Sequence, residues 1–206
     1  MLQKTHLAVG TAVSLAAMLP TDVPTLVIGT GAAFVGSVIC DIDSGSSTSR
    51  KEANLITFFI ALICVILGVV EYFFHLGIAN RVRSDADLVR EILCAAVFIS
   101  VCLIGKQTAH RSFMHSFLCL AVLYSCLAVG LPIAAPYFAV AFFSHQAIDL
   151  LNKKGERLLY PAKTSFALNF CRSDGLVNRI LFLAGTIASV AMILYSVILI
   201  VTLSIG

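Results

Sequence analysis

The chain has 206 residues, of which 59% are hydrophobic and only 12% are charged, and its formal net charge is +3. A typical soluble domain carries roughly 25% charged residues, so this composition excludes an ordinary soluble globule and favours one integral membrane domain over residues 1–206. The small, dispersed positive charge also excludes a basic stripe of the kind that binds nucleic acid, so no nucleic-acid partner is expected.

Apolar runs between polar breaks predict seven membrane helices in chain order. They cover about residues 6–19, 23–40, 54–75, 87–105, 114–130, 133–150 and 178–204. The first run ends at Pro20, close before the second, so this pair is expected to form a short helical hairpin. The N-terminal run has the look of a signal peptide, but the second run follows at once, and we expect a retained helix. The predicted fold class is all-α, a polytopic transmembrane bundle of about seven helices.

Tracing the chain across the membrane puts the N-terminus and three loops, about residues 41–53, 106–113 and 151–177, on one side. Eleven basic residues fall on this side: Lys4, Arg50, Lys51, Lys106, Arg111, Lys153, Lys154, Arg157, Lys163, Arg172 and Arg179. Three fall on the other: Arg81, Arg83 and Arg90. Because short loops rich in Lys and Arg stay in the cytoplasm, we expect a multi-pass protein with a cytoplasmic N-terminus.

The same tracing gathers side chains able to bind metals or transfer protons. His6, Asp41, Asp43, His110, His115, His145 and Asp149 all fall on the cytoplasmic side, and of the five histidines only His75 falls on the other. Polar groups near the hydrocarbon boundary are costly unless they are paired or used. The convergence therefore predicts a functional site at this membrane face.

Two pairs of residues within this set, one of His with Asp and one of two Asp, have informative spacings. His145 and Asp149 are four residues apart, so they share a helix face and can reach one ion. Asp41 and Asp43 cannot share a helix face, but a loop can turn both carboxylates inward. Carboxylates beside histidines suit a divalent ion such as Mg²⁺, Mn²⁺ or Zn²⁺, and we expect one or two ions per chain.

The sequence His110-Arg-Ser-Phe-Met-His115 contributes two imidazoles and one guanidinium. The two histidines are about 140° apart on an ideal helix, so one of them is expected to precede the helix. His115 is predicted to be a metal ligand or a base. Arg111 lies between the histidines, and its fork of donors is predicted to orient an anionic group.

The segments that carry these residues resemble the YdjM-like family, described as LexA-binding, inner-membrane-associated, membrane-bound metal-dependent hydrolases. The resemblance rests on KTHLAVG, VGSVICDID, HRSFMHS and HQAIDLLNKKGERLLYP, from His6 to about Pro161. Where family members commonly have Pro-Asp-x-Asp, this chain has Cys40-Asp41-Ile42-Asp43, and Met114 replaces a Thr. The resemblance implies metal-dependent hydrolysis at a bacterial inner membrane.

Three functions are consistent with this sequence. The leading hypothesis is a hydrolase at the cytoplasmic face that cleaves an ester or phosphoester of an amphipathic or lipid-linked substrate, with membrane lipids as its surroundings. An alternative is an ion or solute transporter, although transporters usually carry polar groups near the bilayer midplane. A third is a non-catalytic scaffold in which the acidic and imidazole groups only pair with nearby Lys and Arg. The sequence does not specify an oligomeric state.

Overall fold

The computed structural model describes residues 1–44 and 85–205, so the predicted helix 54–75, most of the loop 41–53 and His75 lie outside the described residues. The elements in chain order are α1 (Gln3–Met18), α2 (Val23–Val38), η1 (Ile39–Asp43), α5 (Ala86–Gly105), η2 (Phe113–His115), α6 (Phe117–Gly130), α7 (Ala134–Asp149) and α8 (Leu176–Ile205). The all-α prediction is confirmed for the described residues, and six of the predicted helices are present there. The count of seven is not confirmed.

The start of α6 differs from its predicted boundary. The apolar run predicts a helix from residue 114, but residues Phe113–His115 form the short 3₁₀ turn η2 and α6 begins at Phe117. The physical reason is Ser116, which has extended backbone angles and accepts a hydrogen bond from the Cys119 N–H through its side chain. This is an N-cap, and it separates the two imidazole-bearing residues from the helix.

Three described segments are long and apolar enough to cross a membrane: Val23–Asp43, Ala86–Gly105 and Leu176–Ile205. The helices α1, α6 and α7 have only 14 to 16 residues. At 1.5 Å per residue they are roughly 21–24 Å long, which is less than the roughly 30 Å of a hydrocarbon core. Two of these short helices, α1 and α7, carry predicted site residues: His6 in α1, and His145 and Asp149 in α7.

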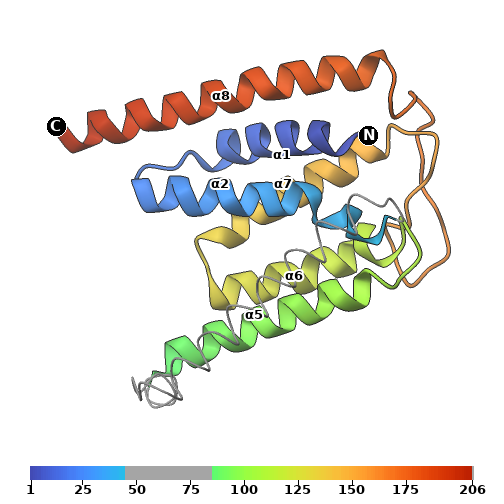
Figure 1. Ribbon diagram of the computed structural model, residues 1–206, viewed down its shortest axis with the longest axis horizontal. Coiled ribbons are helices and arrows are strands. Elements are labelled where there is room, and N and C mark those ends of the chain that lie inside the picture. The colour runs from blue at the N-terminus through green and yellow to red at the C-terminus, as the bar shows by residue number, and fades with distance from the viewer. Residues whose placement is uncertain (45–84, 206) are drawn as a thin grey trace, which may run out of the picture.

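The helices run roughly side by side (Figure 1), with α7 packed against α1, α2 and α6. Outside this group, α8 packs on α1 and α5 packs on α6. The expected hairpin is present: α1 and α2 are joined through Leu19–Asp22 and are in contact. Asp22 caps α2 by accepting a hydrogen bond from the Thr25 N–H. The N-terminus and the connection between α7 and α8 lie at the same end of the bundle, and the C-terminus lies at the other.

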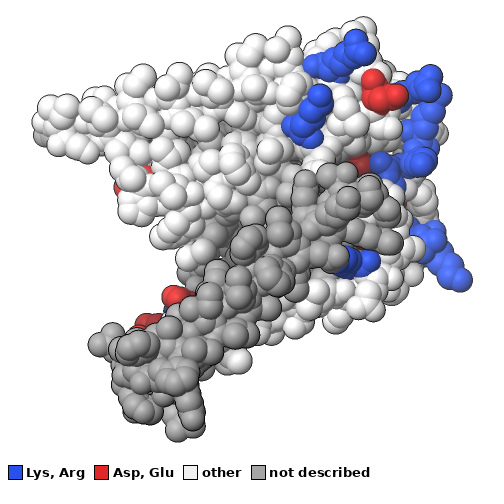
Figure 2. All heavy atoms as spheres, viewed as in Figure 1, with Lys and Arg blue, Asp and Glu red and all other residues white. Residues whose placement is uncertain are grey.

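Basic residues gather at the end of the bundle that carries the N-terminus (Figure 2). The described residues predicted for this side are Lys4, Lys106, Arg111, Lys153, Lys154, Arg157, Lys163, Arg172 and Arg179, and all belong to helix ends or connections there. Arg90 lies near the start of α5, which is at the opposite end. The charge asymmetry that the sequence predicts is therefore present in the described part of the fold.

The contact between α2 and α7 is close at Gly36. A Cβ atom at this position would lie 2.5 Å from the Phe138 carbonyl oxygen. A Cβ at Gly31, in the same helix, would have no heavy atom within 4 Å. The backbones of α2 and α7 therefore approach each other where α2 leads into η1.

We expect Gly36→Ala to separate α2 from α7 and to lower the free energy of unfolding by about 1–3 kcal/mol, the usual cost of overpacking. The measurement is thermal unfolding of the detergent-purified variant. Gly31→Ala is the matched control and should leave stability unchanged or raise it by about 0.5–1 kcal/mol, because alanine favours the helix. Equal unfolding temperatures for the two variants would contradict the close packing.

Candidate metal centre

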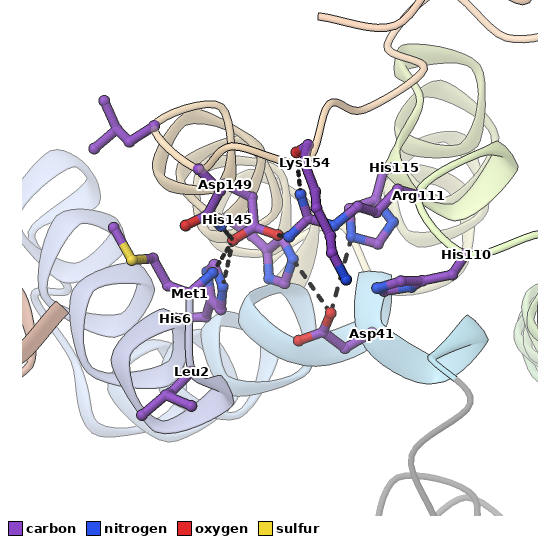
Figure 3. Close-up of polar contacts among 12 residues, drawn as sticks. Met1, Leu2, His6, Asp41, His110, Arg111, His115, His145, Asp149 and Lys154 are labelled. Atoms are coloured by element: carbon purple, nitrogen blue, oxygen red, sulfur yellow. Dashed lines mark hydrogen bonds and ion pairs between the residues drawn. The ribbon is translucent and has the colours of Figure 1, made fainter. Parts of the chain in front are cut away.

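All seven predicted ligand residues meet at one end of the bundle, where five elements or connections converge. Figure 3 labels six of them, all except Asp43. His6 comes from α1, Asp41 and Asp43 from η1, His110 from the connection before η2, His115 from η2, and His145 and Asp149 from the end of α7. The side chains of His110 and Asp41 are 41% and 17% exposed. The other five residues are buried. The cluster is therefore closed except on the side of η1 and the connection before η2.

Three overlapping groups of the described residues place their ligand atoms within 4.8 Å of one another: His6, Asp41 and His145; Asp43, His110 and His115; and His115, His145 and Asp149. The shared members are His115 and His145, so the groups form one continuous cluster. Its donors are imidazole nitrogens and carboxylate oxygens, which suit Zn²⁺ and Mn²⁺.

Asp41 lies between two buried imidazoles. Its Oδ1 is 3.9 Å from Nε2 of His115 and 3.9 Å from Nε2 of His145, and Figure 3 shows both rings turned toward it. Both Nε2 atoms are buried and have no hydrogen-bond partner in the structure. A buried polar atom without a partner is costly, and a cation between the two rings and the carboxylate would satisfy all three groups. The residues present therefore fit a divalent metal ion.

The opposite nitrogen of the His145 ring is held by α2. Nδ1 of His145 is 2.7 Å from the Ser37 carbonyl oxygen. Ser37 is in the last turn of α2, where carbonyl groups lack partners within the helix. This contact places the proton on Nδ1 and leaves a lone pair on Nε2, the arrangement in which metal-binding histidines are usually oriented.

Asp43 has a similar effect on the two histidines near η2. Its Oδ1 is 2.7 Å from Nδ1 of His110, and its Oδ2 is 3.5 Å from Nδ1 of His115. Oδ2 also accepts a hydrogen bond of 3.1 Å from the Arg111 backbone N–H. A single buried carboxylate thus fixes the His110 ring and the Arg111 backbone, and it lies within ion-pair distance of the His115 ring.

Arg111 has a left-handed backbone conformation with φ of 62°, which is uncommon for a residue other than glycine. This conformation lets its N–H reach Asp43 while its carbonyl accepts a hydrogen bond from the Arg157 N–H. The guanidinium donates to Asp149 Oδ2 at 2.7 Å and to the Lys154 carbonyl. Its Nε is buried and has no hydrogen-bond partner in the structure.

Asp149 is surrounded by donors. Besides Arg111, it accepts hydrogen bonds from the Met1 amine and from the Asn152 side chain, the latter at 2.8 Å. Its Oδ1 is also 3.0 Å from Nε2 of His6, and the His6 ring stacks on the His145 ring with centroids 3.8 Å apart. Asp149 therefore ties the start of α1 to the end of α7.

Glu156 is a site residue that the sequence reasoning missed. It is fully buried, and neither carboxylate oxygen has a hydrogen-bond partner. Its backbone pairs with Phe166. Burial, reinforced by the negative charge of Asp149, raises the pKa of the Glu156 carboxyl to about 9, while the Arg111 charge acts in the opposite direction. In the sequence it stands in KKGERLL, which has the composition of a solvated loop and gives no signal of burial.

We expect Glu156→Gln to stabilise the metal-free protein at alkaline pH. The pKa of Glu156 is raised in the folded state, so its contribution to stability is fully present below the ordinary value of 4.5 and is lost as the pH rises toward about 9. Glutamine has no such loss, and the variant should exceed wild type by about 2 kcal/mol at pH 8. This lies below the limit of roughly 5 kcal/mol, since each pH unit above the ordinary pKa of 4.5 removes at most roughly 1.4 kcal/mol. Thermal unfolding at pH 5 and pH 8 measures this difference. An equal difference at both pH values would contradict it.

The comparisons with known proteins agree with a membrane location. A family model described as "YdjM inner membrane protein" matches residues 1–206, the whole chain. Neither the curated proteins nor the solved structures that were compared give a match. Together with three helices apolar enough to span a bilayer, the family match identifies the chain as a membrane protein.

Proposed function

The chain belongs to the YdjM inner membrane protein family, and from this premise we propose that it is a metal-dependent hydrolase with its active site at the cytoplasmic face of a bacterial inner membrane. Two buried imidazole nitrogens support this function. Nε2 of His115 and Nε2 of His145 lie on either side of Asp41, and neither has a hydrogen-bond partner. Binding of a divalent ion is the simplest way to satisfy these atoms.

In this proposal Asp41, His115 and His145 would hold the ion, and His6, which forms a group with Asp41 and His145, would complete the site on the α1 side. The chemistry supplied by a divalent ion held there would be a lower pKa of a bound water, toward about 7, and polarisation of the ester under attack. Asp43 and the Ser37 carbonyl keep the imidazoles in the orientation that binding needs. Arg111, whose side chain is 12% exposed, would offer its remaining guanidinium N–H groups to an anionic group of the substrate.

The position of the site supports an amphipathic or lipid-linked substrate with an ester or phosphoester bond. The cluster lies at the end of short helices, among basic residues that attract a phosphate group. The exposed edges at His110 and Asp41 are the route by which a head group reaches the ion. We place this end of the bundle in the cytoplasm on the distribution of Lys and Arg.

The test of hydrolysis uses metal-loaded protein in mixed micelles with phosphatidic acid, phosphatidylglycerol or a prenyl phosphate, and measures release of phosphate or head group. Activity that depends on added metal and disappears in His115→Ala supports the proposal. Metal-loaded wild type that releases nothing from any of these lipids contradicts it for phosphoesters. A transporter, the alternative function, would instead give metal or solute flux into proteoliposomes.

A further inference from the structure

The connection between α7 and α8 exposes large apolar side chains outside the candidate membrane spans. Leu168 is 67% exposed and Phe170 is 74% exposed, although neither belongs to a helix. Leu159 and Phe166, in the same connection, are also exposed. Exposed apolar groups gathered in one segment indicate a surface that contacts something other than water.

Backbone hydrogen bonds hold this segment at the end of the bundle. The Leu168 N–H donates to the Leu150 carbonyl at 2.8 Å, and the Phe170 N–H donates to the Leu151 carbonyl at 3.0 Å. The two acceptors directly follow the last residue of α7, Asp149. The candidate span α8 begins six residues after Phe170, at Leu176. Leu168 and Phe170 therefore lie beside the end of α7, close to where the connection to α8 begins.

The charges around these side chains are predominantly positive. Between residues 150 and 180, all of which the structure describes, the exposed charged residues are Lys153, Lys154, Lys163, Arg172 and Arg179, with Asp174 as the exposed acid. Five positive charges against one negative charge complement an anionic surface. Apolar side chains flanked by Lys and Arg are the pattern of segments that lie in the head-group region of anionic lipids.

We propose that residues 166–172 form an interfacial anchor, in which Leu168 and Phe170 insert into the head-group region of the cytoplasmic leaflet and the neighbouring basic residues bind anionic phospholipid. The lipid is favoured over a protein partner because the segment is fixed at the boundary of two membrane helices and its exposed charges match an anionic leaflet. The anchor does not depend on hydrolysis or on metal binding.

The chain contains no tryptophan, so a single substitution gives an unambiguous fluorescence probe. Phe170→Trp would be reconstituted in vesicles of phosphatidylcholine with or without phosphatidylglycerol, containing a lipid brominated just below the head group. We expect the indole at position 170 to lose emission to the brominated lipid, and to lose more when phosphatidylglycerol is present. Aqueous iodide should quench it weakly.

Two further variants complete the experiment. Leu194→Trp, at a 58% exposed position within α8, is the control for a lipid-facing indole and should be quenched by lipid brominated deep in the chain. Adding Lys153→Glu, Lys154→Glu and Arg172→Glu to Phe170→Trp should remove the effect of phosphatidylglycerol. Iodide quenching without quenching by brominated lipid would overturn the anchor. So would an indole shielded from both quenchers, which would show that protein covers the segment.

Discussion

Detergent-purified wild-type protein is expected to retain divalent metal near one equivalent per chain, and His145→Ala and Asp41→Ala are each expected to lose it. The affinity for metal should fall at least about 100-fold in either variant. The loss of a residue that only hydrogen-bonds to a metal ligand already lowers the affinity by about 10–100-fold, and loss of a ligand itself should cost more. The two residues come from α7 and η1, which are far apart in sequence. Loss of metal in both variants would therefore place two separate segments at one ion. Elemental analysis measures the metal content directly.

The control is Asp87→Asn, which removes an exposed carboxylate near the start of α5, at the opposite end of the bundle. It should retain the metal content of wild type. Circular dichroism and size-exclusion chromatography would establish that the alanine variants remain folded. Wild type that binds no Mg²⁺, Mn²⁺ or Zn²⁺ after reconstitution would overturn the metal centre and favour the scaffold.

Asp43→Asn is expected to weaken metal binding by about 10–100-fold without abolishing it at saturating metal. The substitution keeps the size of the side chain but removes the charge that holds the His110 and His115 rings and the Arg111 N–H. Titration of metal-free protein, followed by the metal-induced rise in unfolding temperature, measures the affinity.

The titration distinguishes two roles of Asp43. An orienting carboxylate gives weaker binding with unchanged stoichiometry. Asp43 also belongs to a group with His110 and His115 whose atoms lie within 4.8 Å of one another. Loss of a whole equivalent of metal in Asp43→Asn would contradict the orienting role and identify a second ion bound by that group.

The sequence predicted that the candidate site residues lie at one end of the bundle, because successive helices of a hairpin run in opposite directions. This reversal places His6, near the start of α1, at the same end as His145, near the end of α7. Six predicted helices agree with the described structure within three residues at each boundary, and the late start of α6 is due to the cap at Ser116. Long apolar runs make such predictions reliable.

What the sequence could not predict is the partner of each polar atom. The Ser37 carbonyl that holds His145 is a backbone group, and nothing in its side chain marks it. Arg111 was predicted to face an anionic substrate group, and in the structure its guanidinium donates to Asp149 and to the Lys154 carbonyl. Glu156 is buried because the connection between α7 and α8 folds back over the site. These contacts depend on tertiary packing, which hydrophobic periodicity does not specify.

The contact between Asp149 and the start of α1 bears on how the protein is made. Synthesis proceeds from α1 toward α8, so His6 leaves the ribosome long before Asp149 exists to pair with it. In a chain halted before α7 has been made, the His6 imidazole would lack the Asp149 carboxylate that it contacts in the complete fold. The cluster therefore cannot be complete until α7 has been synthesised, and an ion that needs both segments can be held only after that point.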